Sequence, residues 1–162
     1  MKDILLQWFA FVPDWLSVVL LSALPVTELR ASLPIALFYY DLPISQAVFF
    51  SVLGNTIPLF LVFLLFSPLL SWAKRRSPIL HRLIEDHVRK LEHRHAQKYQ
   101  RWGAIFLLIF VAIPLPGSGV WTGSLLAVLF GMKPSLSIPA IFLGLLSSAG
   151  IVLLLSFGIV SL

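Results

Sequence analysis

The sequence contains no cysteine and few charged residues. The absence of cysteine excludes disulfide bonds, thiol catalysis and cysteine-ligated metal centres. Charged residues make up 12% of the 162 residues, whereas a soluble domain carries about a quarter because its surface faces water. Hydrophobic residues make up 59%, and the mean hydropathy is +0.95. The composition therefore predicts an all-α integral membrane protein whose surface faces lipid, built as one membrane domain over residues 1–162.

Most of the positive charge lies in one block. Nine of the twelve Lys and Arg residues fall between Lys74 and Arg101, and all four His residues lie in the same block. A basic block between two hydrophobic halves indicates a cytoplasmic loop rather than a nucleic-acid-binding surface. We expect residues 77–99 to form an amphipathic helix within a connector over residues 74–102. Its His residues match no recognised ligand spacing, so neither a metal site nor a cofactor is expected.

The hydrophobic segments are of two kinds. Two of them, Ser45–Trp72 and Leu136–Leu162, are long enough to cross about 30 Å of hydrocarbon. The other two are each interrupted by a proline-containing break, which leaves runs of about ten residues on either side. The breaks are Pro25–Arg30 and Pro114–Gly119. Runs this short predict half-helices or re-entrant segments rather than full crossings.

Proline and glycine residues recur at corresponding positions in both halves of the chain. The aligned positions are Pro25 with Pro116, Pro43 with Pro134 and, within one residue, Gly54 with Gly144. This order predicts two repeats, over residues 1–73 and 103–162, each a re-entrant helical hairpin followed by a transmembrane helix. Paired broken segments favour inverted repeats, whereas straight crossings of every segment would make the repeats parallel. The N-terminal run up to Val12 is expected to lie at the interface as a short helix.

Glu28 and Arg30 are charged residues inside the first hydrophobic half. A charged side chain at membrane depth costs at least ~2.5–3.5 kcal/mol, so it normally faces a cavity, a partner or both. Their spacing of two residues places the side chains roughly 200° apart on a helix. They therefore need different partners, or a broken backbone that lets them converge. A substrate or proton site and a structural ion pair are both consistent with this pattern.

The breaks also carry groups that suit an anion. Thr27 and Ser118 are expected to cap the helices that follow them, and glycine at positions 117 and 119 allows close approach of the backbone. Helix N-termini present unpaired N–H groups and partial positive charge, which favour a phosphate or carboxylate. Asn55 is a further polar residue in an apolar segment. The predicted substrate-binding residues are Glu28, Arg30, Thr27, Asn55, Pro116, Gly117, Ser118 and Gly119.

Short ordered motifs resemble the putative small multidrug export protein family. They are Glu28-Leu29-Arg30 followed by Leu33-Pro34, then Gly54-Asn55-x-x-Pro58, then Pro114-Leu115-Pro116-Gly117-Ser118-Gly119. The chain is also distantly similar to the DedA/VTT membrane proteins, which have paired re-entrant hairpins in inverted repeats. Members of that group are implicated in moving polyprenyl phosphate or phospholipids across bilayers. The resemblance implies the same architecture here.

The similarity to the DedA/VTT proteins is partial. Their Pro-Gly-Glu motif is matched by Pro25 and Glu28, and their Gly-Asp motif is matched by Gly54-Asn55. Their second hairpin carries a motif with two arginines, of which the stretch Val111–Gly117 keeps only a proline. The missing acid and arginines leave open whether substrate and proton coupling are shared. Arg30 is a candidate source of the positive charge.

These features predict a multi-pass transporter in the cell inner (plasma) membrane. The expected substrate is an anionic amphiphile such as a lipid phosphate, bound by Arg30 and coupled to protons through Glu28. The alternatives are an exporter of lipophilic cations, which Glu28 would bind, and a non-transporting membrane scaffold or assembly factor. No nucleophile–base pair stands out, so an enzyme is not expected. Membrane lipids are the expected partners, and the small size favours a homodimer.

Overall fold

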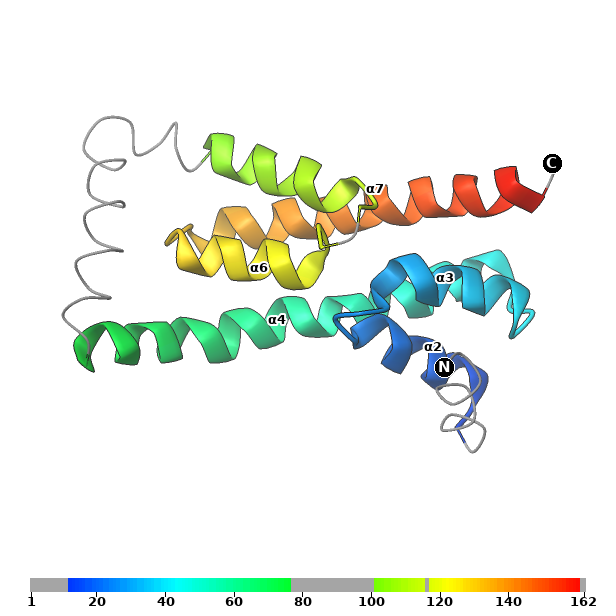
Figure 1. Cartoon of the computed structure of the whole chain (residues 1–162), viewed down its shortest axis with the longest axis horizontal. Coiled ribbons are helices and arrows are strands. Elements are labelled where there is room, and N and C mark those ends of the chain that lie inside the picture. Colours follow the sequence, from blue (N-terminus) through cyan, green and yellow to red (C-terminus); the bar gives the residue numbers. More distant parts are fainter. Residues whose placement is uncertain (1–11, 77–100, 116, 161–162) are drawn as a thin grey trace. The chain divides into compact units, whose positions relative to one another are not determined.

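The computed structural model describes residues 12–76, 101–115 and 117–160, and every regular element in these ranges is an α-helix. The helices are α2 (Asp14–Ala23), α3 (Glu28–Phe38), α4 (Ile44–Arg76), the helix Arg101–Ala112, α6 (Val120–Leu129) and α7 (Pro134–Val160) (Figure 1). The all-helical prediction is thus confirmed for the described residues. The predicted N-terminal interfacial helix and the predicted connector helix over residues 77–99 lie outside them.

α4 and α7 contain two segments that are long and apolar enough to cross a membrane. They are Ile44–Phe66, with 23 residues, and Pro134–Gly158, with 25 residues. At a rise of about 1.5 Å per residue, each exceeds the roughly 30 Å of a hydrocarbon core. Both begin within two residues of the spans predicted from hydropathy. The other apolar helices of the described chain are Asp14–Ala23, Arg101–Ala112 and Val120–Leu129, and all three are too short to span alone.

Prolines and left-handed residues mark the turns between these helices. Pro43 directly precedes α4 and accepts a hydrogen bond from the Ala47 N–H at 2.9 Å. Pro134 is the first residue of α7, a position where the missing N–H leaves no helical hydrogen bond unmade. Gly131 has a φ of 63° in the turn before α7, a backbone conformation that glycine adopts without steric cost. The predicted proline-marked turns are therefore present.

The chain forms two compact units, and the long helices contribute to both. The first unit comprises Met1–Ile57 and Ser148–Leu162, and the second comprises Pro58–Ser147. The first unit therefore holds α2, α3, the beginning of α4 and the end of α7. The second holds the rest of α4, the helix Arg101–Ala112, α6 and the beginning of α7.

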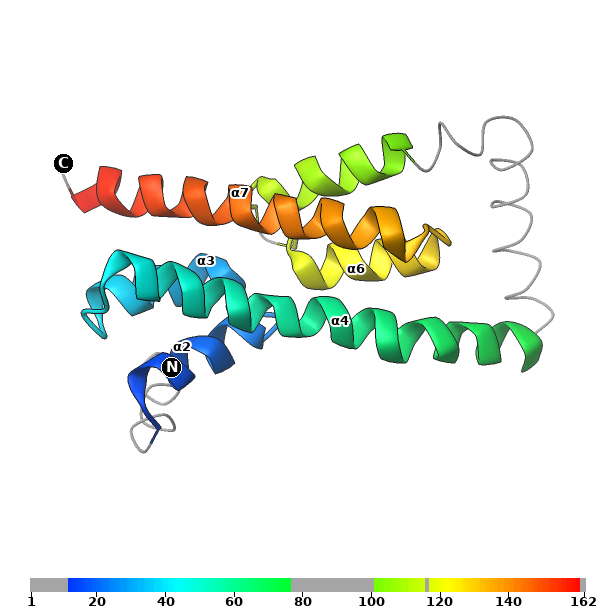
Figure 2. The same ribbon diagram turned by 180° about the vertical axis from the view of Figure 1, so that it is seen from behind.

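In the first unit, α2 and α3 form an antiparallel helical hairpin closed by the turn over residues 24–27 (Figures 1 and 2). α4 packs against α2 at Gly54, where an added Cβ would clash with the carbonyl oxygen of Val19 and lie 2.9 Å from the Cβ of Ser22. The Ser22 hydroxyl donates a hydrogen bond to the carbonyl of Ser51 at 2.5 Å. The buried apolar residues of the hairpin include Val18, Leu21, Leu29, Leu33 and Ala36.

In the second unit, the helix Arg101–Ala112 and α6 form another helical hairpin, followed by α7 (Figures 1 and 2). Gly144 of α7 lies against the backbone of the first of these helices, since an added Cβ would stand 2.6 Å from the Leu108 carbonyl oxygen. Gly123 of α6 lies against the side chain of Val111, 2.7 Å from such a Cβ. Gly144 therefore lets the long helix approach the hairpin closely, and Gly123 lets the two helices of the hairpin approach each other.

Each of the two units contains a close contact of the same kind, between a glycine and a backbone carbonyl. In each, a glycine of the long helix abuts a carbonyl oxygen six residues before the first proline of the break. Gly54 meets Val19 in the first unit, and Gly144 meets Leu108 in the second. When Pro25 is aligned with Pro116, the two contacts agree to within one residue in the long helix and two residues in the hairpin, so the correspondence is approximate. The inverted orientation of the repeats, their bounds and the re-entry of the hairpins into the membrane stay predictions.

Candidate functional site

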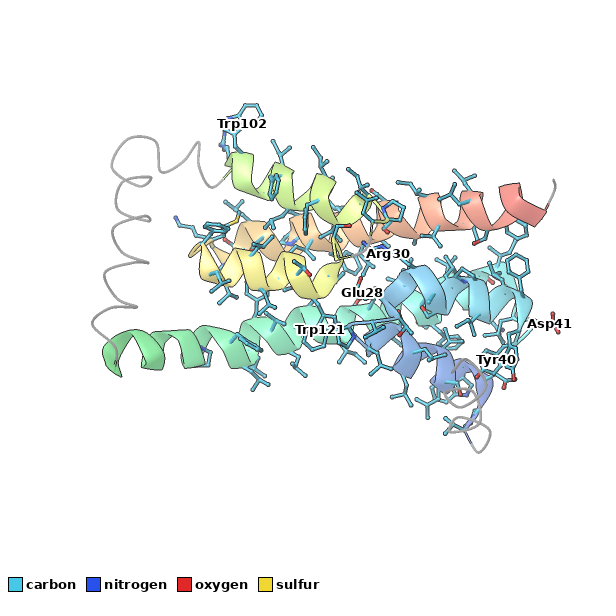
Figure 3. All side chains as sticks on the ribbon, viewed as in Figure 1. Glu28, Arg30, Tyr40, Asp41, Trp102 and Trp121 are labelled. Atoms are coloured by element: carbon cyan, nitrogen blue, oxygen red, sulfur yellow. The ribbon has the colours of Figure 1, made fainter. Side chains whose placement is uncertain are left out.

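The two charged residues at the start of α3 form an ion pair with each other. Arg30 donates a hydrogen bond from Nη1 to Oε2 of Glu28 at 2.9 Å. The Glu28 side chain is 8% exposed and the Arg30 side chain 20% exposed, so the carboxylate is the deeper partner. Figure 3 shows both side chains at the start of α3, at the closed end of the hairpin. The first unit therefore holds a neutralised but buried charge pair.

The backbone at Glu28 explains how residues two positions apart can meet. Glu28 has a φ of 45°, in the left-handed region, although it is the first residue of α3. A left-handed conformation costs an L-residue roughly 1–2 kcal/mol. It also breaks the regular helical spacing that would hold the two side chains on opposite faces. Of the two arrangements open from sequence, the structure thus shows convergence through a broken backbone.

The turn before α3 is fixed by Thr27, though not as a cap. Thr27 has αR backbone angles, whereas a capping residue is usually extended, and its side chain makes no hydrogen bond to the first turn of α3. The hydroxyl instead donates to the carbonyl of Leu21 near the end of α2. The predicted Thr27 cap is therefore wrong. The residue satisfies one of the carbonyls that a helix C-terminus leaves unpaired.

Polar atoms without hydrogen-bond partners occur on all three N-terminal helices of the first unit. Among its described residues, they include the hydroxyls of Ser17, Ser32 and Ser51 and the Oδ1 of Asn55. Asn55 follows Gly54 on α4 and is 2% exposed. Each buried polar atom left unpaired costs about 1–3 kcal/mol, so such atoms usually meet water or a polar ligand group. Asn55 is therefore a buried polar residue in the same unit as Glu28, and its role in a substrate site stays a prediction.

The second break holds Ser118 in a closed turn. Its Oγ lies 2.7 Å from the Ile113 carbonyl and 2.9 Å from the Leu115 carbonyl, and it accepts a hydrogen bond from the Leu115 N–H at 3.3 Å. Gly119 is the N-cap of α6, which has no side-chain capping bond. The predicted Ser118 cap is therefore wrong, because these contacts direct the hydroxyl back to the end of the preceding helix.

Gly117 is the conformationally demanding residue of this second turn. Its φ is 82°, and an added Cβ would meet nothing within 4 Å. The space beside this residue is open, and approach of a ligand to its backbone stays a prediction. Pro116 lies outside the described residues.

The predicted site residues belong to different units. Glu28, Arg30, Thr27 and Asn55 lie in the first unit, and the structure brings the first two into direct contact. Gly117, Ser118 and Gly119 lie in the second. A single site shared by both groups stays a prediction.

A cavity that sequence reasoning missed lies at the beginnings of α2 and α4. Its volume is about 820 Å³. It is lined by Pro13, Asp14, Trp15, Leu42, Ser45, Gln46, Phe49 and Phe50. Its two walls are separated by more than twenty-five residues in the sequence, so only tertiary packing assembles them. The adjacent acid and aromatic at positions 14 and 15 are the one local signal that could have drawn attention to it.

The fold and the charge pair define a helical membrane protein with two long apolar helices and buried charge in a broken hairpin. Residues 28–151 match the model of the family described as Putative small multi-drug export protein. The match covers most of the chain, which therefore belongs to this family. It includes the Glu28–Arg30 pair and the second break, and it begins after α2. No curated protein and no solved structure matches the chain.

Proposed function

We propose that this protein exports small amphipathic molecules that carry a positive charge, with the Glu28 carboxylate as the binding group. One observation carries the proposal: the Glu28 carboxylate is buried in an apolar segment and is paired with the more exposed guanidinium of Arg30. The family description supports export of drug-like molecules. Two helices that are long and apolar enough to cross a membrane are consistent with a transport protein.

The mechanism follows from charge balance in a medium of low dielectric constant. A buried carboxylate needs a partner of opposite charge, because an isolated ionised group is very costly to bury. Arg30 supplies that charge at rest. A substrate cation can replace Arg30 at the carboxylate, while the long arginine side chain turns its charged end toward a more polar region. Glu28 stays neutralised throughout the exchange.

A proton can replace Arg30 in the same way, because a protonated carboxyl group needs no counter-charge. Proton and substrate then compete for one carboxylate. Binding of one releases the other, which couples export of the cation to entry of a proton. Coupling of this kind needs no second binding group.

An anionic amphiphile such as a lipid phosphate is the second candidate. Arg30 is the more exposed member of the pair, so an approaching ligand meets the guanidinium first. Protonation of Glu28 would release Arg30 to bind a phosphate, for which its fork of donors is well suited. The distant similarity to the DedA/VTT proteins supports this candidate. The family description weighs against it, because that description names export of drugs and not of lipids.

We place the protein in the cell inner (plasma) membrane as a multi-pass homodimer of two inverted repeats. Each repeat would consist of a re-entrant hairpin followed by a transmembrane helix. The shared order of hairpin and long helix supports this arrangement, as does the shared glycine contact at Gly54 and Gly144. The DedA/VTT proteins have the same order.

The test is transport by the purified protein in proteoliposomes under an imposed pH gradient. We expect movement of tetraphenylphosphonium by the wild type, loss of this movement in Glu28→Gln, and partial retention in Arg30→Gln. If Arg30→Gln abolishes movement of a fluorescent phosphatidic acid and the wild type ignores the cation, the substrate is the anion. If both variants lose stability while no probe moves in the wild type, the protein is a scaffold.

A further inference from the structure

The cavity at the beginnings of α2 and α4 lies wholly within the first unit and does not include Glu28 or Arg30. One wall is formed by the first residues of α2 and the other by the first two turns of α4. Its aromatic walls are open to a ligand, since the Trp15 side chain is 46% exposed and that of Phe49 is 60% exposed. It is therefore a candidate binding site in its own right.

The aromatic residues of the cavity form one cluster. The Trp15 and Phe50 ring centroids are 5.7 Å apart at an interplanar angle of 36°, and the Phe49 and Phe50 centroids are 5.3 Å apart at 72°. The three rings thus present differently tilted faces along the lining. The negative face of an aromatic ring attracts a cation within about 6 Å, by about 0.5–1 kcal/mol at an exposed site.

Asp14 supplies the only charge among the lining residues. It lies in the first turn of α2, directly before Trp15. The other polar residues, Ser45 and Gln46, are neutral. A carboxylate beside three rings complements an organic cation, which gains from both the full charge and the ring faces. An organic anion would be repelled by the same carboxylate.

The size of the cavity selects among organic cations. Sites for drug-sized ligands have volumes of about 300–1,000 Å³ and are mostly apolar, with a few polar groups that fix orientation. A cavity of about 820 Å³ with five apolar lining residues fits this description. A small ammonium headgroup alone would leave most of the volume unfilled. The volume therefore leaves room for a whole amphipathic molecule.

We propose that this cavity binds drug-sized amphipathic cations, with Asp14 as the counter-charge and Trp15, Phe49 and Phe50 as the aromatic walls. The ligand class is the one proposed above for export, so the inference rests on that function for its biological meaning. Binding itself is independent of Glu28. The cavity would be a recognition site separate from the site of exchange.

The experiment measures binding of tetraphenylphosphonium by isothermal titration calorimetry, with the full-length protein in phosphatidylglycerol nanodiscs. Tetraphenylborate is the matched probe, because it has nearly the same shape and the opposite charge. Asp14→Asn removes the charge and keeps the size of the side chain. Asp41→Asn is the matched control, since Asp41 is an exposed acid outside the cavity lining. Phe49→Leu removes a ring, and Phe60→Leu removes an equally exposed ring elsewhere on α4.

We expect Asp14→Asn and Phe49→Leu each to weaken tetraphenylphosphonium binding about two- to fivefold, with no change in either control variant. Tetraphenylborate should bind more weakly than its cationic counterpart to the wild type and should not lose affinity in Asp14→Asn. Equal affinities of wild type and Asp14→Asn for the cation would overturn the proposal. Strong competition by phosphatidylcholine added to the nanodiscs would also overturn it, because the occupant would then be a lipid headgroup.

The same nanodiscs separate this inference from the proposed function. Glu28→Gln should keep the Asp14-dependent binding while it loses transport. Normal transport by Glu28→Gln together with Asp14-dependent binding would contradict the exchange mechanism and support cation binding in the cavity. Suppose instead that Asp14→Asn binds and transports as the wild type does, while Glu28→Gln does not transport. This result would contradict cation binding in the cavity and support the exchange mechanism.

Discussion

Gly54 of α4 lies so close to the carbonyl oxygen of Val19 on α2 that no side chain fits between the two backbones. A Cβ at this position would also stand 2.9 Å from the Cβ of Ser22. Both obstacles belong to the backbone or its first side-chain atom, so neither can rotate out of the way. The contact fixes how the hairpin meets the long helix.

Gly54→Ala should therefore destabilise the protein. We expect a loss of about 1–3 kcal/mol in the free energy of unfolding, the usual cost of overpacking a close contact. Gly150→Ala is the control, because an added Cβ there meets nothing within 4 Å and alanine favours helix by up to about 1 kcal/mol. Denaturant titration in detergent would measure both. Equal stability of the two variants would show that the helices do not pack this closely.

Gly144→Ala should have a similar effect through the second unit. Its added Cβ would stand 2.6 Å from the Leu108 carbonyl oxygen and 3.0 Å from the Cβ of Val111. We expect a loss of about 1–3 kcal/mol. Measured beside Gly54→Ala, this variant tests whether the shared glycine contact has a shared role. A neutral Gly144→Ala would limit that role to the first unit.

Glu28 and Arg30 should show strong energetic coupling. Glu28→Gln and Arg30→Gln each leave the other charge without its partner, so each should lower the free energy of unfolding by about 1–3 kcal/mol. The double variant removes both charges and should lose less than the sum of the single variants, with a coupling of about 0.5–3 kcal/mol. Thermal unfolding of the four proteins measures the cycle. Additive effects would mean that the observed hydrogen bond contributes little.

Ser22→Ala should remove a hydrogen bond between α2 and α4. The Ser22 hydroxyl is buried and donates to the Ser51 carbonyl at 2.5 Å. Loss of this bond should cost about 0.5–1.5 kcal/mol. Ser147→Ala is a suitable comparison, since the Ser147 hydroxyl bonds the Leu143 carbonyl of its own helix on an exposed face. We expect the comparison variant to lie within about 0.5 kcal/mol of the wild type.

The topology can be tested because the chain has no native cysteine. Single cysteines at Leu42, Lys133 and Gly158 would be labelled in intact cells with a membrane-impermeant thiol reagent. Inverted repeats with re-entrant hairpins predict labelling at Leu42 and Gly158 and protection at Lys133. Straight crossings of every segment predict labelling at Leu42 and Lys133 and protection at Gly158. The second result would remove the basis for inverted repeats.

The sequence was most informative where one physical property decides the outcome. Hydropathy and length located both long helices to within two residues at their starts, because a bilayer imposes a minimum apolar length. Proline marked the turns before α4 and α7, because its ring fixes φ and its nitrogen has no hydrogen to donate. These properties belong to single residues or short segments, so they can be read without a structure.

The details of the site depended on geometry that spacing does not encode. Thr27 and Ser118 were expected to cap the helices after them, but both hydroxyls bond carbonyls of the preceding helices. The Glu28–Arg30 contact depends on a left-handed backbone conformation at Glu28, which a regular α-helix does not contain. The cavity beside Asp14 required two segments far apart in the sequence to pack together. The first three contacts lie within six residues and depend on turn angles that residue spacing does not specify, whereas the cavity depends on tertiary packing.

Glu28 combines two unfavourable states in a single residue, a backbone in the left-handed region and a carboxylate removed from water. Each state depends on the other, because the backbone angle brings Arg30 within reach and Arg30 stabilises the buried charge. When a proton or ligand binds the carboxylate in place of Arg30, the ion pair that compensates the left-handed backbone angle of Glu28 is lost. Chemistry at one oxygen atom is thereby linked to the direction in which α3 leaves the turn.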